Sequence, residues 1–307
     1  MSRALDIQVV AKGLQFPEGP ISLSDGSIIL VEMKRQTLSR VSPDGKIEVI
    51  AHLGGGPNGA AVGPDGAIYV CNNGGFEWAD VGGALIPGHK PHDYAGGSIQ
   101  RVDLNSGAVT TLYTECGGEP LLGPNDLVFD ASGGFWFSDH GKSNVQYREH
   151  GGLYYAKADG SQITKLRGEM LGPNGVGLSP DGQQLYVAET PTGRLWAFEI
   201  DGPGQLKPGP APWLPGRLVC TLPGFQLLDS LKVEAGGKVC VGTLVNGGIT
   251  VFEPDGAAEH IAFPDLAITN LCFGGDDLRD VWATGSSSGA LYKCRWPRPG
   301  LKLAYNG

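Results

Sequence analysis

The chain is short of basic residues and has no long hydrophobic run. Its 307 residues include 23 Lys and Arg against 32 Asp and Glu, which gives a net charge of −9. Nucleic-acid binding depends on clustered Lys and Arg that neutralise phosphates, so this balance argues against a nucleic-acid partner. No window approaches the ~20 apolar residues of a membrane-spanning helix, and residues 1–13 lack the pattern of a signal peptide. We therefore expect a cytoplasmic protein whose partners include neither nucleic acid nor a membrane.

Closely spaced cysteines and helical patterns are also missing. The six cysteines lie far apart along the chain, at Cys71, Cys116, Cys220, Cys240, Cys272 and Cys294. A Cys-x-x-Cys metal or redox site is thereby excluded, and buried free thiols are expected. No segment has the apolar period of an amphipathic helix. The chain also lacks a glycine-rich motif followed by a helix, which excludes a nucleotide-phosphate loop, and a Gly-x-Ser-x-Gly segment, which weakens a serine-hydrolase interpretation.

Glycine, by contrast, is abundant. The chain contains 50 Gly and 22 Pro, yet 41% of its residues are apolar, so it can bury a large core. Many glycines fall between short apolar runs, as in Asp25-Gly26, Asp65-Gly66 and Asp181-Gly182. Two-residue turns of this kind need positive φ and join the strands of β-hairpins. The composition therefore predicts an all-β protein rich in tight turns.

A repeat runs through the whole chain. Residues 56–71 read GPNGAAVGPDGAIYVC and recur at 172–187 as GPNGVGLSPDGQQLYV and, more loosely, at 123–137 as GPNDLVFDASGGFWF. Weaker copies begin at Phe16, Leu228 and Ile268. Each copy reads as a short apolar strand, a tight turn and a second apolar strand, and third and fourth strands follow in most copies. Self-similarity at this spacing indicates a repeat architecture.

Aligning the turns places one residue of each copy in register: Glu18, Asn58, Asn125, Asn174, Asp229 and Thr269. The intervals between them are 40, 67, 49, 55 and 40 residues. A period of ~40–50 residues with four strands per unit is typical of a propeller blade. Six units exhaust the chain, so we predict one six-bladed β-propeller domain over residues 1–307, closed by pairing of residues 7–11 with the C-terminal strands. The longest interval contains an insertion at about 74–97, which we expect to be a long loop, and long loops are often functional lids.

Equivalent positions on the innermost strands of a propeller surround its central channel, so the register residues should converge. Four of them offer side-chain oxygens that suit Ca²⁺, Mg²⁺ or Mn²⁺: Glu18, Asn125, Asn174 and Asp229. A single Asn-Gly after Pro is more often a turn. A turn does not explain Glu and Asp in the same register, and facing buried carboxylates repel unless a cation or proton joins them. We therefore predict one divalent cation, with Ca²⁺ first and Mg²⁺, Mn²⁺ or Zn²⁺ as alternatives.

Several segments together resemble those of a known family. They are residues 16–20 (FPEGP), 124–127 (PNDL), 172–175 (GPNG), 228–230 (LDS) and 272–275 (CFGG). Over nearly its whole length the chain resembles the senescence-marker-protein/gluconolactonase family, which includes regucalcin and bacterial sugar lactonases. The resemblance implies that Glu18, Asn174 and Asp229 are direct metal ligands. It implies that Asn125 sits at the metal or on the substrate, with Asp126 beside it.

The family includes enzymes that bind one divalent ion and hydrolyse cyclic esters, so the resemblance implies a metal-dependent lactonase acting on a sugar lactone, an aldonolactone. A metal polarises the lactone carbonyl and lowers the pKa of water, and Asp229 is the expected catalytic residue that accepts the water's proton. Whether the water needs Asp229 as its base stays open. Two alternatives also stay open: hydrolysis of phosphotriesters or non-sugar lactones at the same site, and a non-catalytic propeller with a structural metal.

Candidates for substrate contact are less sharply defined. Some sugar-binding family members carry an Arg two residues before the Asn of the third blade, where this chain has Gly123. The insertion instead supplies Trp78 and Tyr94, which either pack on a substrate or only stabilise a surface loop. Further substrate candidates are the register residue Asn58, Asp126, and His140, which follows the second strand of the third copy. His140 either polarises the substrate or bonds within its loop. The oligomeric state is not predicted.

Overall fold

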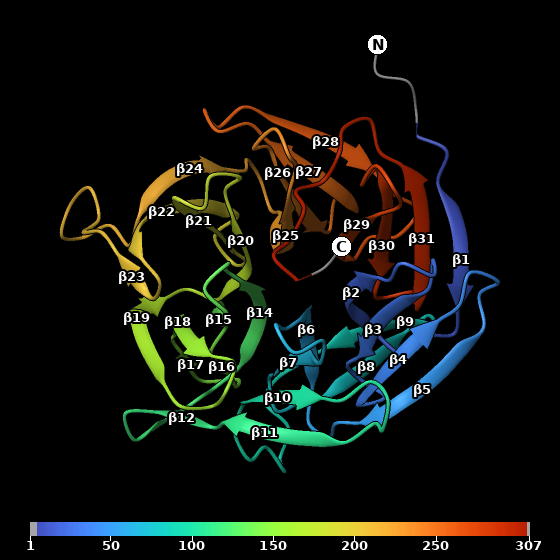
Figure 1. The fold of residues 1–307 in the computed structure, drawn as a ribbon, viewed down its shortest axis with the longest axis horizontal. Coiled ribbons are helices and arrows are strands. Elements are labelled where there is room, and N and C mark those ends of the chain that lie inside the picture. The colour runs from blue at the N-terminus through green and yellow to red at the C-terminus, as the bar shows by residue number, and fades with distance from the viewer. Residues whose placement is uncertain (1–4, 306–307) are drawn as a thin grey trace.

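The computed structural model describes residues 5–305, which form six four-stranded antiparallel blades arranged in a ring around a central channel (Figure 1). Residues 5–305 contain no helix, and so none that is long and apolar enough to cross a membrane. Apolar strands joined by glycine turns explain this architecture. They form small sheets, and each sheet buries its apolar faces against the blades on either side. The predicted six-bladed β-propeller is confirmed.

The first three blades follow one another along the chain, each from the channel outward. Blade 1 comprises β2 (Pro17–Ser22), β3 (Ile28–Glu32), β4 (Thr37–Val41) and β5 (Ile47–His52). Blade 2 comprises β6 (Pro57–Val62), β7 (Ile68–Asn72), β10 (Ser98–Val102) and β11 (Val109–Tyr113). Blade 3 comprises β14 (Pro124–Phe129), β15 (Gly134–Asp139), β18 (Gly151–Lys157) and β19 (Ile163–Met170).

The last three blades complete the ring. Blade 4 comprises β20 (Pro173–Leu178), β21 (Gln184–Glu189), β22 (Arg194–Gly202) and β24 (Arg217–Thr221), with the short β23 (Gln205–Leu206) paired to the end of β22. Blade 5 comprises β25 (Leu227–Val233), β26 (Val239–Leu244), β27 (Gly248–Phe252) and β28 (Ala258–Ala262). Blade 6 comprises β29 (Ile268–Gly274), β30 (Asp280–Gly285), β31 (Ala290–Arg295) and β1 (Gln8–Lys12).

The ring is closed by strands from the two ends of the chain. β1 pairs antiparallel with β31, from Gln8 opposite Lys293 to Lys12 opposite Ala290. The N-terminal strand is therefore the outermost strand of a blade whose other three strands come from the C-terminal end. This is the predicted closure, and it makes the last blade depend on both ends of the chain.

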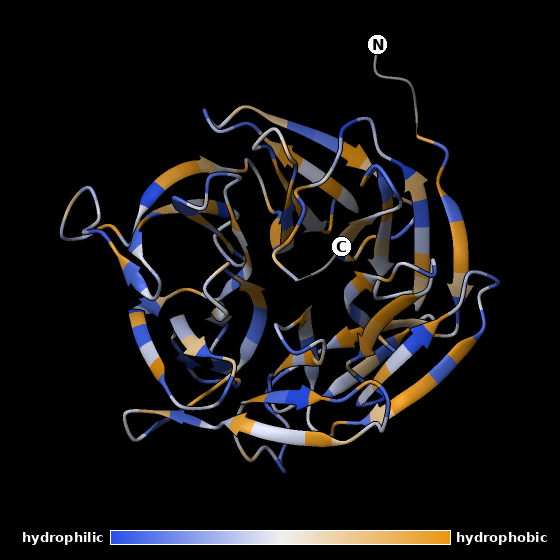
Figure 2. Cartoon of the chain, in the orientation of Figure 1, coloured by the Kyte–Doolittle hydropathy of each residue, from blue (hydrophilic) through white to orange (hydrophobic). Residues whose placement is uncertain are grey.

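Six clusters of buried apolar side chains hold the ring together, one at each interface between neighbouring blades. Between blades 2 and 3, for example, the ring of Tyr69 lies 5.0 Å from Phe129 and 5.9 Å from Phe135. Orange apolar segments run along the strands of every blade in Figure 2. Burying one such side chain contributes roughly 1.5–3 kcal/mol. The core is thus divided among the interfaces, which leaves the channel free for polar groups.

All six cysteines are free thiols, four of them buried, as expected. The predicted hairpin turns are also present: Gly26, Gly66 and Gly182 have φ of 80°, 76° and 68°. Only residues without a Cβ adopt this region readily.

Three short hairpins extend beyond the blades. They are β8 (Trp78–Val81) with β9 (Ala84–Pro87), β12 (Glu115–Cys116) with β13 (Glu119–Pro120), and β16 (Lys142–Ser143) with β17 (Arg148–Glu149). The first lies inside the insertion at 74–97, which the sequence predicts to be a long loop. Gly82 and Gly83 form the tip of this hairpin and have positive φ. This Gly-Gly turn was not predicted, because it lies outside the blade repeats.

Candidate metal centre

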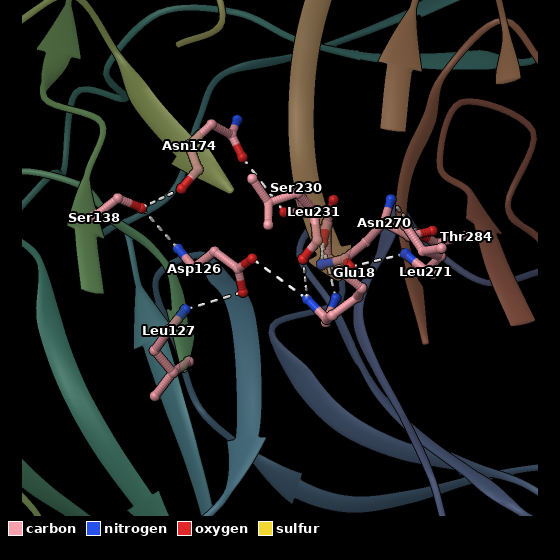
Figure 3. A network of polar contacts seen from close by, with 12 residues as sticks. Glu18, Asp126, Leu127, Ser138, Asn174, Ser230, Leu231, Asn270, Leu271 and Thr284 are labelled. Carbon is pink, nitrogen blue, oxygen red and sulfur yellow. Dashed lines mark hydrogen bonds and ion pairs between the residues drawn. The ribbon is translucent and has the colours of Figure 1, made fainter. Parts of the chain in front are cut away.

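All six innermost strands begin at the same mouth of the channel. The register residues are the second residue of the inner strand in five blades and the third in blade 5, in which Asp229 lies in β25. Figure 3 shows Glu18, Asp126, Asn174 and Asn270 approaching one another from different blades. Residues up to 252 positions apart in sequence thus meet in one place.

Each inner strand departs from regular pairing at this position. The register between first and second strand shifts after Glu18, Pro57, Pro124, Pro173, Leu228 and Ile268. Such an irregularity bends a strand and turns a side chain out of the alternation along it. Because the shift recurs in every blade, the six register residues share the same orientation at the channel mouth.

Glycine after a register residue allows neighbouring inner strands to approach. A Cβ on Gly19 would lie 2.7 Å from Asn58 O, one on Gly59 2.4 Å from Asn125 O, and one on Gly175 2.4 Å from Leu231 N. Asn58 and Asn174 lie inside strands β6 and β20. The turn interpretation of Asn-Gly is therefore wrong at both positions, because the glycine serves close contact between blades.

Glu18 is a buried carboxyl group, 1% exposed. Its Oε2 atom accepts hydrogen bonds from the backbone N–H of Gly19 and from Asn270 Nδ2, both at 2.8 Å. Burial raises the pKa of Glu18 to about 7, against the opposing effect of hydrogen bonds from Thr269 and Asn270. The group is held in one orientation, yet its negative charge lacks a cation among these partners.

Asp229 faces the same space and is more exposed than Glu18. Burial, followed by the charge of Glu18, raises the pKa of Asp229 well above its usual value, while a hydrogen bond from Asn174 lowers it. Neighbouring carboxyl groups that disfavour ionisation in this way form a site for a shared proton or a cation.

The two asparagines supply neutral oxygens. Asn174 Nδ2 donates to Thr190 Oγ1 at 3.1 Å, and Asn174 Oδ1 accepts from Ser230 Oγ at 3.4 Å. Asn125 Oδ1 is buried and finds no hydrogen-bond partner within residues 5–305. A buried acceptor left unpaired costs roughly 1–3 kcal/mol, so this oxygen fits a ligand that accepts its lone pairs.

Taken together, these donors fit one hard divalent cation. The set contains two carboxylates and two amides, and oxygen ligands of this kind suit Ca²⁺, Mg²⁺ or Mn²⁺. No group of three or more His, Cys, Asp or Glu in the described part of the chain could hold a metal ion. The asparagine oxygens are therefore needed to complete the site.

Asp126 lies beside this donor set, and its charge raises the pKa of both Glu18 and Asp229. Its carboxylate is fully buried and lies 3.5 Å from Lys232 Nζ, which also donates to Leu231 O at 2.9 Å. Burial raises the pKa of Asp126, and the charge of Lys232 lowers it. The ion pair with Lys232 orients this carboxylate, and contact between Asp126 and a substrate stays a prediction.

Sequence analysis missed both Asn270 and Lys232. A signal existed for each, because each is a polar residue inside an inner-strand segment that is otherwise mostly apolar. Asn270 directly follows the register residue Thr269. A lone Lys among the apolar residues of β25 predicts a buried partner of opposite charge, here Asp126.

The substrate candidates lie at the same mouth. Asn58 is buried at the start of β6. Trp78 packs against Phe16, two residues before Glu18, with ring centroids 5.0 Å apart. Tyr94 donates its hydroxyl to Leu122 O, just before β14. Trp78 and Tyr94 therefore hold the insertion against blades 1 and 3.

Two backbone hydrogen bonds fix the insertion further. Leu85 N donates to Ser287 O and Lys90 N donates to Ser143 O, both at 3.0 Å. The insertion thus leaves blade 2 and contacts blades 1, 3 and 6 beside the metal-site mouth. These contacts hold the insertion in one position at the mouth.

His140 follows β15 at this mouth. Burial and the charges of Arg148 and Lys142 lower the pKa of His140 to about 3. The imidazole is therefore neutral, and its buried Nδ1 has no hydrogen-bond partner within residues 5–305.

A family model described as the SMP-30/gluconolactonase/LRE-like region matches residues 16–287. The chain belongs to this family. This member of the SMP-30/gluconolactonase/LRE-like family is 25% identical over 303 residues to the gluconolactonase of Zymomonas mobilis, with 87% of this chain and 76% of the relative covered. It is 29% identical over 254 residues to lactonase drp35 of Staphylococcus saprophyticus, with 82% and 70% covered. It is 28% identical over 200 residues to the diisopropyl-fluorophosphatase of Loligo vulgaris, with 60% and 61% covered.

Two solved structures share the fold. A gluconolactonase of Xanthomonas campestris superposes with a TM-score of 0.74 at 22% identity and covers 95% of this chain and 90% of its own. Regucalcin of Agrobacterium tumefaciens, described as a calcium-binding protein, superposes with a TM-score of 0.71 at 18% identity and 98% coverage of both chains. The SMP-30/gluconolactonase/LRE-like chain described here is thus a propeller of the same build as these proteins.

Proposed function

We propose that this protein hydrolyses a lactone with the help of one divalent cation held by Glu18, Asn125, Asn174 and Asp229. The observation that carries the proposal is the closeness of the Glu18 and Asp229 carboxyl groups at the channel mouth, where the charge of Glu18 raises the pKa of Asp229. The buried Asn125 Oδ1 atom, which lacks a hydrogen-bond partner within residues 5–305, supports it. Relatives named gluconolactonase and lactonase support the reaction class. Ca²⁺ is the first choice of ion, with Mg²⁺, Mn²⁺ and Zn²⁺ as alternatives.

When bound, the cation would polarise the lactone carbonyl and lower the pKa of the attacking water. Asp229 is the residue proposed to accept the water's proton, because it is more exposed than Glu18. Glu18 is fixed by Asn270 and Gly19 and serves to hold the site in shape. The water oxygen adds to the carbonyl carbon, the ring C–O bond breaks, and the ring oxygen takes a proton and leaves as a hydroxyl group.

A sugar lactone is the proposed substrate class, following the gluconolactonase relatives. A second candidate is hydrolysis of a phosphotriester or a non-sugar lactone at the same site. The 28% identity to a diisopropyl-fluorophosphatase and the apolar Phe16–Trp78 pair beside Glu18 favour it.

The test measures proton release from a panel of γ- and δ-lactones by chelator-treated protein to which Ca²⁺, Mg²⁺, Mn²⁺ and Zn²⁺ are added back singly. We expect turnover to return with one or two ions and to be lost in Glu18→Gln. Glu199→Gln is the matched control, because Glu199 is an exposed carboxylate in the outer part of blade 4. Metal binding without hydrolysis of any lactone would overturn the proposal, and hydrolysis of diisopropyl fluorophosphate alone would select the second candidate.

A further inference from the structure

We infer that Arg148 forms an anion-binding subsite beside the metal centre, and that the substrates are lactones that carry a carboxylate group. That the substrate is a lactone rests on the proposed function. That it carries an anionic group rests on the geometry of the mouth. Neither the family match nor any relative's name points to an acidic substrate.

Arg148 begins β17, in the hairpin that follows β15 at the metal-site mouth. Its guanidinium makes one hydrogen bond, from Nη2 to His140 O at 3.1 Å. It forms no ion pair with any residue from 5 to 305, and its buried Nε has no partner there either. A partly buried cation with free donors is therefore present in a protein whose net charge is −9.

Gly172 makes room for this cation directly beside the metal centre. It precedes β20 and lies two residues before Asn174. A Cβ at position 172 would lie 2.3 Å from Arg148 Nη2 and 2.9 Å from His140 Cε1. The guanidinium and the imidazole thus rest on the start of the inner strand that carries a proposed metal ligand.

Within residues 5–305, the carboxylates nearest to Arg148 have other partners. Glu189 is the acid whose charge acts on it, but the Glu189 carboxylate already accepts from Leu171 N at 3.0 Å, Thr192 Oγ1 at 2.6 Å and Trp196 Nε1 at 3.3 Å. Glu149, its neighbour in sequence, pairs with Lys90 Nζ at 3.1 Å.

Nearby groups favour an anion at this place. Lys142 lies near His140 and adds positive charge on this side of the mouth when it is protonated, below its pKa of about 7. The buried Arg148 Nε has no partner within residues 5–305 and remains free to donate a hydrogen bond. Arg presents a planar fork of N–H donors that matches a carboxylate. A lactone with its carbonyl at the metal centre and a ring carboxylate at Arg148 would satisfy both sites.

The experiment compares γ-butyrolactone-γ-carboxylate with its primary amide, which has the same ring and no charge. An ionic hydrogen bond is worth about 10- to 100-fold in kcat/KM, so we expect the wild-type protein to prefer the carboxylate by that factor. Arg148→Gln should abolish the preference, because kcat/KM for the carboxylate should fall to the level of the amide. Arg217→Gln is the matched control, because Arg217 lies exposed on the outer strand β24 and forms no ion pair in the described part of the chain.

A binding measurement separates this inference from the proposed function. Calorimetric titration of metal-loaded protein compares 2-hydroxyglutarate with 4-hydroxybutyrate, both of which carry one carboxylate for the metal while only the first carries a second. Tighter binding of 2-hydroxyglutarate that disappears in Arg148→Gln supports the subsite even if no lactone is hydrolysed. Equal binding of both acids, or equal hydrolysis of carboxylate and amide, overturns the subsite while leaving the lactonase standing. If Arg148→Gln fails to fold, Arg148→Lys, which loses the fork and keeps the charge, should reduce the preference without removing it.

Discussion

The two ends of the central channel are built from the same six inner strands and carry opposite chemistry. At the mouth where the strands begin lie Glu18, Asn125, Asn174 and Asp229. At the far end the same strands line a cavity of about 460 Å³ with apolar side chains, Ile21, Val62, Phe129, Leu178, Val233 and Phe273 among them. Residues 301–305 also line this cavity. Polarity therefore reverses within one strand length of six or seven residues.

This difference shows how a repeat fold separates stability from chemistry. The interface clusters and the far end are apolar in every blade, so they add to the stability of the ring. Polar groups at the mouth converge only because each copy holds them in the same register. The Asp126–Lys232 ion pair marks the border, since Asp126 directly follows a proposed ligand and Lys232 lines the far cavity.

The largest effect should follow from removing charge at the mouth. Asp229→Asn and Glu18→Gln keep the size of the side chains and remove one carboxylate each. We expect kcat/KM for lactone hydrolysis to fall by at least ~10³-fold in both variants, in the range attributed to a lost general base. Steady-state kinetics on the best lactone of the panel provides the measurement. Wild-type rates in either variant would contradict the role given to the mouth.

We expect the next largest effect from breaking the Asp126–Lys232 ion pair, which lies between the two ends of the channel. Lys232→Met leaves Asp126 buried without its partner, and removing one member of a buried pair costs about 3–5 kcal/mol. Urea unfolding should show this loss, and adding Asp126→Asn should recover part of it. Lys207→Met is the matched control, because Lys207 pairs with Glu199 at the exposed edge of blade 4 and should cost at most ~1 kcal/mol. Equal costs for the two lysine variants would mean that the channel centre is as well solvated as the surface.

The repeat made the fold predictable from the sequence. Blade number, the closing strand and the inner-strand register of Glu18, Asn125 and Asn174 all follow from glycine turns and apolar alternation, which are local signals. Asp229 sits one position later in its strand than the others, yet its chemistry identified it in the same alignment.

What the sequence did not reveal depends on contacts between blades. Asn270 bonds Glu18 across 252 positions, and Lys232 reaches Asp126 across 106 positions. Arg148 is one of many charged residues in the sequence, and only its missing partner distinguishes it. The β8–β9 hairpin was missed because the insertion belongs to no repeat. Local sequence patterns predict strands and turns, whereas the pairing of polar side chains depends on how the blades pack in the ring.

A smaller effect concerns a buried base near the mouth. Lys142 is 2% exposed, and its Nζ donates to Gly75 O at 2.6 Å and lies 3.8 Å above the ring of Phe76. Burial lowers the pKa of Lys142 from 10.5 to about 7. Between these two values the unfolded chain holds a proton that the folded protein has lost. The free energy of unfolding should therefore rise with pH in this window by up to about 1.4 kcal/mol per pH unit.

Urea unfolding across this pH window measures the effect against Lys142→Met, in which this contribution to the pH dependence should be absent. Lys157→Met is the control, because Lys157 is exposed at the end of β18 and the variant should follow the wild type. Parallel curves for wild type and Lys142→Met would show that Lys142 does not lose its proton in this range, and that the mouth tolerates its charge.

The smallest effect belongs to the far end and tests whether the two ends are independent. Tyr305 packs edge-on against Phe129 of β14 with ring centroids 5.7 Å apart. Tyr305→Ala should reduce the free energy of unfolding by about 1 kcal/mol, the value of an aromatic pair, while Tyr305→Phe should keep most of it. Both variants should hydrolyse lactones at the wild-type rate, because Phe129 lies at the opposite end of the strand from Asn125. A marked fall in kcat/KM for Tyr305→Ala would mean that packing at the far end sets the position of the mouth, and the division between the two ends would then be wrong.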